Sequence, residues 1–511
     1  MEKTQPTYFL SWLPYWQAIE RLLAGVKNPT LLLGLTGSLS VLVYAILFSQ
    51  RVNLLTLYAQ PRLDGSYPFW GDPAIRWHFI VAFAFLFTLY WLGWRFALVA
   101  RGRKAWWVVA GGALAFGIAL LFMYPFEAAD IFDNIMHGRI LGIYGQNPFT
   151  VPASAFRNDP FYSYMAWKRA ASAYGPLWEL LAGGMARLAG NGLLANILAF
   201  KLLSGLFLVG SILVLALLLK DLAPQRALPG TLLLAWNPLV LYETLGNGHN
   251  DIAMLFWLLL AVWAMGRQRH SLAVLALTAG ALVKFIPLLL LPGAVLISLM
   301  RKPAWSERLR WLVLNLLAVL ALVCLAYAPF WQGLETLSIA RRARLFSASL
   351  PAALYHILEP SLGADHAATL VSGTAAVLLL CFCLWRAWSS RQDHSWLNFP
   401  RLAFDILMFY LLLTCLWFQQ WYALWLIALA AILSPGHRAR LGALFSLLVL
   451  NKQFVLGPYL LRQRPPIPQP WLEILFAAGL LLVPWLYAAY LAIYKHPQPL
   501  LTRNPALPSE Q

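Results

Sequence analysis

Residues 193–219 read LLANILAFKLLSGLFLVGSILVLALLL, and Lys201 carries the one charge in this stretch. A helix needs about 20 apolar residues to cross a bilayer, so this segment is long enough to span one. Similar runs recur at 30–49, 77–99, 105–124, 228–246, 251–266, 308–330, 367–388, 402–418, 420–434, 439–456 and 471–494. These runs are unbroken, without the alternation of a transmembrane barrel, so helices must satisfy the backbone in hydrocarbon. The sequence therefore predicts an all-α polytopic membrane protein.

The composition excludes the other broad classes. Hydrophobic residues make up 61% of the 511 residues and charged residues 11%. Soluble domains are about half apolar and about a quarter charged, so neither a soluble enzyme nor a disordered chain fits. The four cysteines lie in apolar runs at spacings that indicate neither a disulfide framework nor a zinc site.

Two segments leave the number of crossings open. Residues 174–190 are short and contain Glu179 and Arg187, and residues 271–299 are interrupted by Lys284 and Pro287. We expect 174–190 to lie along the membrane surface and 271–299 to form a broken hairpin that returns to its starting side. The prediction is a bundle of about 12–14 transmembrane helices with surface helices in the first long outer loop.

The charge distribution supports this topology. With the N-terminus inside, the inner side holds 22 basic and 7 acidic residues, and the outer side holds 14 and 13. This asymmetry is the positive-inside pattern, so the net charge of +18 reflects topology and predicts no nucleic-acid partner. The expected location is the plasma membrane.

The chain reads as a single membrane domain with short ends. We expect residues 1–29 to be a cytoplasmic and interfacial segment, with an interfacial helix over 8–24. The transmembrane domain covers 30–494, its main outer loop covers 125–192, and 495–511 form a cytoplasmic tail.

The first long outer loop carries three carboxylates, Glu127, Asp130 and Asp133, at a spacing of three. On a helix they share one face, where mutual repulsion favours a raised pKa or a bound cation. Both outcomes suit a general base or a metal site. A solvated helix face is the alternative.

Three further motifs are candidates, of which the first two lie on the outer side by parity and the third lies within the membrane. Tyr174-Gly175-Pro176-Leu177 opens the surface segment. The 246–251 loop, Gly-Asn-Gly-His-Asn-Asp, offers His249 and Asp251, although solvation and helix capping would also explain them. Lys284, in an apolar segment, is a functional candidate because an intramembrane charge is costly, although its side chain could also snorkel to the interface.

Two clusters complete the candidates. Arg341, Arg342 and Arg344 stand on the side that basic residues normally avoid, which favours a phosphate or a phospholipid head group as ligand. The stretch 417–422 pairs aromatic residues with Gln419 and Gln420, a combination common at sugar sites.

In this order the motifs resemble a GT-C superfamily glycosyltransferase, which takes a sugar from a polyprenyl-phosphate carrier. The phrases HGR…YG-x-NPF, YGPLW, NPLVLYE…NGHND, LVKFIPLLLLP and QQWYALW are most similar to bacterial polyprenol-phosphate-mannose-dependent mannosyltransferases. The YGPL segment also resembles the surface helix of protein mannosyltransferases. The resemblance covers about residues 105–435.

The resemblance implies an inverting transfer, by single displacement, of a sugar from a polyprenyl-phosphate donor to a glycan or lipid-linked acceptor. It implies Asp130 as the base, with Asp133 or Glu127 as the alternative, because Asp130 is followed by Ile131-Phe132-Asp133 and not by the family's usual aromatic residues. Lys284, Arg341, Arg342, Arg344 and His249 would bind the donor phosphate. The expected substrate-binding residues are His137, Tyr174, Asn250, Asp251, Gln419, Gln420, Trp421 and Tyr422. The family includes cation-dependent and cation-independent members, so a divalent cation stays open.

Two other classes of membrane protein would have the same pattern of apolar segments. A transporter or flippase for lipid-linked sugars should show internal repeats, and none is evident. A ligase or polymerase of surface polysaccharide would centre on a late outer loop, whereas here the acid-rich loop comes early.

Overall fold

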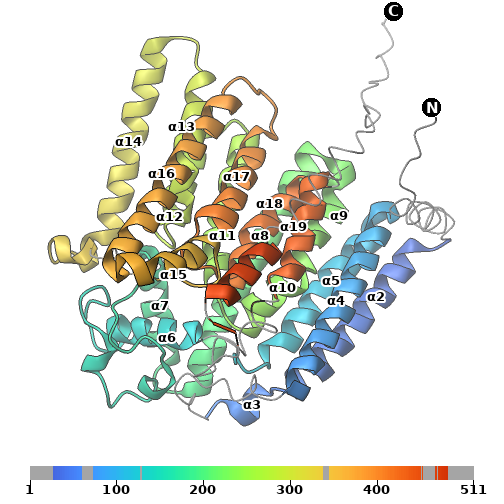
Figure 1. Ribbon diagram of the computed structural model, residues 1–511. Helices are drawn as coiled ribbons and strands as arrows, with labels where there is room; N and C mark the ends of the chain where they lie inside the picture. Colours follow the sequence, from blue (N-terminus) through green and yellow to red (C-terminus); the bar gives the residue numbers. More distant parts are fainter. Residues whose placement is uncertain are drawn as a thin grey trace, which may run out of the picture.

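The computed structural model describes residues 27–59, 73–126, 129–337, 345–434, 436–450, 452, 467–468 and 470–480. Within these ranges the regular structure is helical, and β-pairing is limited to two isolated bridges, Asn53–Met123 and Ser347–Trp417. Most helices run side by side as one bundle (Figure 1). The predicted all-α polytopic fold is confirmed.

Six long apolar helices of the described ranges can cross a membrane by length and composition. They are α2 (Pro29–Val43) with η2 (Tyr44–Gln50), α4 (Pro73–Val99), α5 (Gly102–Leu121), α8 (Leu193–Leu222), α14 (Trp305–Tyr327) with η7 (Ala328–Phe330), and α16 (Ala364–Ser390).

Shorter apolar helices fill the space between them: α11 (Asp251–Gly266), α12 (His270–Ala281), α13 (Leu291–Met300), α18 (Ala423–Ile432) and Pro470–Leu480. The remaining elements are α3 (Leu54–Leu57), α6 (Asp130–Gly142), η3 (Ala153–Ala155), η4 (Tyr162–Tyr164), α7 (Pro176–Ala189), α9 (Pro224–Ala235), α10 (Pro238–Leu241), η5 (Tyr242–Gly246), η6 (Ile286–Leu289), α15 (Leu350–Leu362), α17 (Asn398–Phe409), η9 (Tyr410–Thr414), η10 (Gln420–Tyr422) and α19 (His437–Leu448).

Two predicted spans are not single helices. The 228–246 run divides into α9, α10 and the π-helical turn η5. Proline at 238 lacks an amide donor, and the Asn237 side chain accepts the N–H groups of Leu239 and Val240, so a new helix begins there. The 402–418 run ends at Thr414 after the π-helical turn η9. The predicted interfacial helix at 8–24 lies outside the described residues.

The 271–299 segment forms the expected broken hairpin. α12 ends at Ala281, η6 follows the break, and α13 ends at Met300. The two ends of the hairpin that lie away from its turn are close together. The charges of Arg301 and Lys302 act on His270, and Trp311 Nε1 donates to Ser271 Oγ at 3.0 Å. Lys284 therefore lies at the turn of the hairpin.

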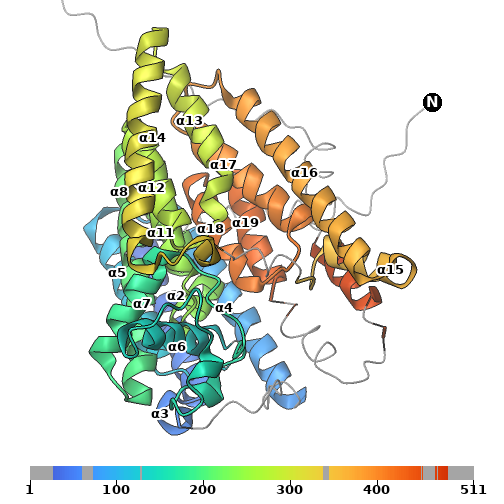
Figure 2. The same cartoon turned by 90° about the vertical axis from the view of Figure 1, so that its left-hand side faces the viewer.

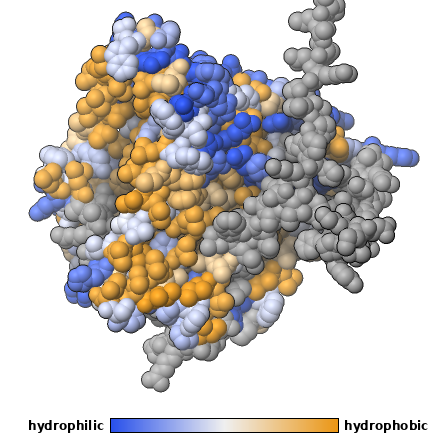
Figure 3. Space-filling model, turned by 45° about the horizontal axis from the view of Figure 1, so that its top comes forward, coloured by the Kyte–Doolittle hydropathy of each residue, from blue (hydrophilic) through white to orange (hydrophobic). Residues whose placement is uncertain are grey.

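The two ends of the bundle differ in character. The upper end in Figure 1 holds the α11–α12, α13–α14 and α16–α17 connections, and α6 and α7 lie at the lower end. Figure 3 brings the upper end forward and shows hydrophilic side chains gathered there beside broad apolar surfaces. Basic residues of that end include Arg386 and Arg438, which share Asp405. Figure 2 shows α14 and α16 on two sides of α13 and α17.

Close helix packing around Trp236 joins the first helices to α9. The indole lies against Gly37 of α2, Gly93 of α4 and Gly112 of α5, and its Nε1 donates to Val109 O at 2.8 Å. Small residues let membrane helices approach closely, and here three of them leave room for one large side chain.

This packing predicts that Gly112→Ala destabilises the fold. A Cβ at 112 would lie 2.6 Å from Trp236 Cζ2, and the indole is buried. Overpacking of this kind costs about 1–3 kcal/mol, so the melting temperature of the purified protein should fall. The control is Gly111→Ala on the same helix, where an added Cβ meets no atom within 4 Å. Equal melting temperatures for the two variants would contradict the packing argument.

Candidate functional site

The carboxylates of the first outer loop begin a helix. α6 starts at Asp130, which places Asp130 and Asp133 in its first turn, where the helix dipole favours negative charge. Asp130 is half-buried and accepts from the Tyr174 hydroxyl at 3.3 Å. Asp133 is buried and accepts the N–H of Trp167 at 3.2 Å. Asp130 is therefore the more accessible of the two, and Glu127 lies outside the described residues.

An internal ion pair holds the rest of this loop. Arg139 is buried, and its guanidinium donates to Asp159 at 2.8 Å and to Gly190 O at 2.7 Å. α7 packs closely on α6, because Cβ atoms at Gly138 and Gly142 would collide with carbonyl oxygens of α7. Arg139 belongs to the HGR phrase but was not predicted as a site residue, and its partner Asp159 lies 20 residues further along the chain.

The Tyr-Gly-Pro-Leu segment docks on the hairpin turn. Gly175 N–H donates to Val283 O and Leu177 N–H donates to Leu282 O, both at 2.9 Å. A Cβ at Gly175 would lie 2.1 Å from Leu282 O, so only glycine permits this approach. The docking places Tyr174 next to Lys284, whose Nζ lies 5.9 Å from the tyrosine ring centre.

Lys284 is paired inside the protein. Its Nζ lies 2.8 Å from both carboxylate oxygens of Asp251, the first residue of α11. Trp425 Nε1 donates to the same carboxylate at 2.9 Å, and the ammonium lies 4.7 Å from the ring centre of Tyr422. Lys284, which was predicted to bind the donor phosphate, therefore already has a carboxylate partner. A phosphate bound to the Lys284 ammonium would compete with Asp251 for it.

His249 lies in the loop between η5 and α11, stacked on Trp421 with ring centres 3.9 Å apart. Its Nδ1 lies 3.0 Å from the carboxylate of Glu243, which is fully buried. Burial alone would lower the pKa of His249, but the hydrogen bond and charge of Glu243, with the charges of Asp130 and Asp251, outweigh it and raise the pKa. Glu243 was not predicted, although a carboxylate inside an apolar run is a signal for function.

The other predicted residues surround this group. Asn250 is buried, and neither atom of its amide has a hydrogen-bond partner among the described residues. Gln420 is also buried, and Gln419 accepts from Lys452. His137 is buried within α6. The unpartnered amide of Asn250 suits a polar ligand, because buried polar atoms normally have partners.

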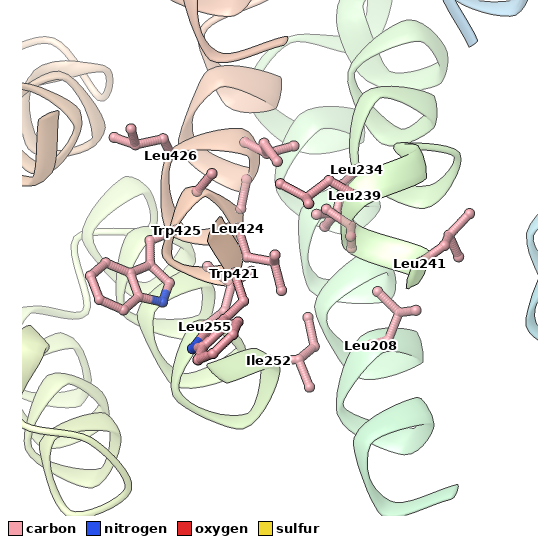
Figure 4. Packing of buried hydrophobic residues seen from close by; sticks show 14 of the residues in the cluster. Leu208, Leu234, Leu239, Leu241, Ile252, Leu255, Trp421, Leu424, Trp425 and Leu426 are labelled. Atoms are coloured by element: carbon pink, nitrogen blue, oxygen red, sulfur yellow. The ribbon is translucent and has the colours of Figure 1, made fainter. Parts of the chain in front are cut away.

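These contacts join segments far apart in the chain into one group, called here the site cluster: Asp130, Tyr174, His249, Asp251, Lys284, Trp421 and Tyr422. The charges of Asp130 and Asp251 both act on His249, which connects α6 with α11. Figure 4 shows Trp421 of η10 and Trp425 of α18 on one side of a packed group of apolar side chains from α8 to α11 and α18. The predicted phosphate-binding residues Arg341, Arg342 and Arg344 lie outside the described residues.

The helical membrane fold and the motifs at this cluster agree with the class that the sequence resembles, a membrane-embedded glycosyltransferase. Residues 31–300 match the family model described as alpha-(1->6)-mannopyranosyltransferase, N-terminal domain. The match covers more than half of the chain, and the protein belongs to this family, so the predicted mannosyltransferase is confirmed. A sugar donor and a glycan acceptor follow from that class. No curated protein and no solved structure matches the chain.

The pairing of Lys284 predicts an asymmetric response to mutation. Lys284→Met should lower the free energy of unfolding by about 3–5 kcal/mol, because the buried Asp251 carboxylate would lose its cation. Adding Asp251→Asn should restore most of the loss, since no charge would then be left unpaired. Chemical denaturation of the purified protein measures both changes.

The exposed pair Arg267–Asp221 supplies the control. Its side chains are 48% and 35% exposed, so Asp221→Asn should change the free energy of unfolding by about 1 kcal/mol or less. A single Lys284→Met variant as stable as the double variant would show that the buried pair does not hold the hairpin turn.

Proposed function

We propose that the protein transfers mannose from a polyprenyl-phosphate carrier to a glycan or lipid-linked acceptor and forms an α-(1→6) linkage. The observation that carries the proposal is the site cluster, where an accessible carboxylate, Asp130, lies within electrostatic reach of a buried histidine, His249. The description of the family supports the sugar and the linkage. The lipid carrier follows from the resemblance of the motifs and from the membrane fold.

Asp130 is the proposed general base. An acceptor hydroxyl is a poor nucleophile at neutral pH and needs a carboxylate within hydrogen-bond reach to take its proton. The Tyr174 hydroxyl, 3.3 Å from the carboxylate, would orient it. The acceptor oxygen forms its bond to the anomeric carbon as the bond to the carrier phosphate breaks. A single displacement inverts the configuration, so a β-linked donor gives an α-linked product.

The departing phosphate takes the bonding electron pair and needs stabilisation. His249 and Lys284 are the cations proposed for this role within the site cluster, together with Arg341, Arg342 and Arg344. Trp421, Tyr422, Asn250 and Gln420 are proposed to contact the sugars, since aromatic faces and amides suit carbohydrate hydroxyls. A transporter or a polysaccharide ligase would be a different class from the family that the chain matches.

Replacement of the base tests the proposal most directly. Asp130→Asn keeps the size of the side chain but cannot accept the proton, so turnover should fall by about 10²–10⁴. The assay uses purified protein, polyprenyl-phosphate-mannose and candidate glycan acceptors, with products read by mass spectrometry. Asp133→Asn is the matched control. If Asp133→Asn alone abolishes turnover, the base lies one turn along α6, and if both variants stay active, this loop is not catalytic.

We further propose that the end of the bundle with the site cluster faces the extracytoplasmic side of the plasma membrane. The basic residues at the opposite end support this orientation through the positive-inside rule. Carrier-linked sugars suit that side, because the lipid phosphate serves as leaving group and no nucleotide is needed.

Cysteine labelling tests the orientation. Gln146, after α6, and Gln225, at the start of α9, are both exposed and belong to opposite ends of the bundle. In a background without the four native cysteines, an impermeant maleimide added to intact cells should label Gln146→Cys and leave Gln225→Cys unlabelled. The reverse pattern would invert the proposed topology.

A further inference from the structure

Glu243 is a buried carboxylate that the proposed reaction leaves without a role. Its side chain is fully buried in the π-helical turn η5, at the end of the bundle that holds the site cluster. A carboxylate in such a place is costly unless it is paired. One oxygen, Oε2, lies 3.0 Å from His249 Nδ1 and accepts from Asn247 Nδ2 at 3.2 Å.

The local backbone fits this pairing. His249 N–H donates to Glu243 O at 2.9 Å, which folds the loop back on η5. Gly248 adopts a φ of +76°, and a Cβ there would lie 2.5 Å from Ile131 Cδ1 of α6. The loop therefore packs against the residue that follows Asp130. π-Helical turns of this kind are frequent at functional sites.

The second nitrogen of the His249 ring is unused. Nε2 is buried and has no hydrogen-bond partner among the described residues. Nδ1 lies 3.0 Å from Glu243 Oε2 and 3.2 Å from the main-chain O of the same residue. With Nδ1–H donated to Glu243, Nε2 is an acceptor in the neutral ring and a donor in the cation. One face of the ring stacks on Trp421, with ring centres 3.9 Å apart. A leaving phosphate needs a donor, so the protonated ring is the useful form.

We propose that Glu243 is a positioning residue, which holds the His249 ring in one orientation and keeps it protonated, so that Nε2–H donates a hydrogen bond to the departing phosphate of the sugar donor. The inference rests on the proposed function. The proton of the acceptor hydroxyl still goes to Asp130, the phosphate leaves with its electron pair, and His249 keeps its proton. A carboxylate behind a histidine is an arrangement that fixes the tautomer and raises the basicity of the ring.

The charges around the ring agree with this role. Glu243 from η5, Asp130 from α6 and Asp251 from α11 all favour the imidazolium, and the ammonium of Lys284, from the hairpin turn, lies 2.8 Å from the Asp251 carboxylate. His249 thus acts as a donor below its raised pKa and loses that role as the pH rises through it. His249 therefore sets the alkaline limb of the pH profile of activity.

The test is the pH profile of kcat/KM for polyprenyl-phosphate-mannose, measured with the full-length purified protein and a mannose-containing acceptor. Glu243→Gln keeps the shape of the side chain but removes the charge. In this variant, the fall of kcat/KM at high pH should begin at a lower pH than in the wild type. At pH 8 kcat/KM should be about tenfold or more below the wild-type value, as for other residues that support a functional histidine. Near pH 5.5 the loss should be smaller.

Two controls separate this role from a structural one. Glu179→Gln removes another fully buried carboxylate, which bonds to Ser172 Oγ at 2.5 Å, and should leave the alkaline limb in place. Glu243→Asp keeps the charge and should keep the limb at its wild-type position, even if turnover falls. It also serves as the working variant if Glu243→Gln does not fold.

Mutation of both members of the pair completes the test. If Glu243 acts through His249, the double variant Glu243→Gln/His249→Gln should be no slower than His249→Gln alone, because residues that act as a unit are not additive. The role of Glu243 would be overturned if the alkaline limb stays in place in Glu243→Gln or moves in Glu243→Asp. In that case, transfer by the wild-type protein would still support the proposed function. A wild-type protein that does not use this donor would overturn both.

Discussion

The contact between the Lys284 ammonium and the Asp251 carboxylate is the constraint on which the rest of the site depends. Lys284 interrupts an apolar segment and Asp251 is buried at the start of an apolar helix, so each charge is costly without a partner. They must meet, and they do so at 2.8 Å with the Trp425 indole as a further donor. This contact joins the hairpin turn to the first turn of α11, and it holds Lys284 and Asp251 of the site cluster together.

The break in the 271–299 hairpin makes that contact possible. A continuous helix would keep its carbonyl groups for itself, whereas here Leu282 O and Val283 O accept the N–H groups of Leu177 and Gly175. The surface segment is thereby held by backbone hydrogen bonds, and its tyrosine reaches Asp130. A turn that frees two carbonyl groups therefore positions both a cation and the hydroxyl next to the candidate base.

The prediction from the sequence succeeded where the signal is local. Apolar runs indicated the helical membrane class, Pro287 and Lys284 indicated the broken hairpin, and charge parity placed the loops of Asp130 and His249 at the same end of the bundle. It was less accurate at 228–246, where hydropathy alone does not register that Asn237 and Pro238 start a new helix. It missed the roles of Glu243 and Arg139, because their pairing with His249 and Asp159 depends on side-chain contacts that hydropathy does not specify.

The sequence by itself determined that this chain is a helical membrane protein and which loops carry its polar residues, since hydropathy and helix length depend on neighbours along the chain. Only the tertiary structure decided that Lys284 pairs with Asp251, that Glu243 supports His249, and that Trp236 lies against glycines of three helices. Those pairings depend on the packing of helices against one another. The cost of a buried charge requires a partner, but it does not by itself specify which residue of the chain that partner will be.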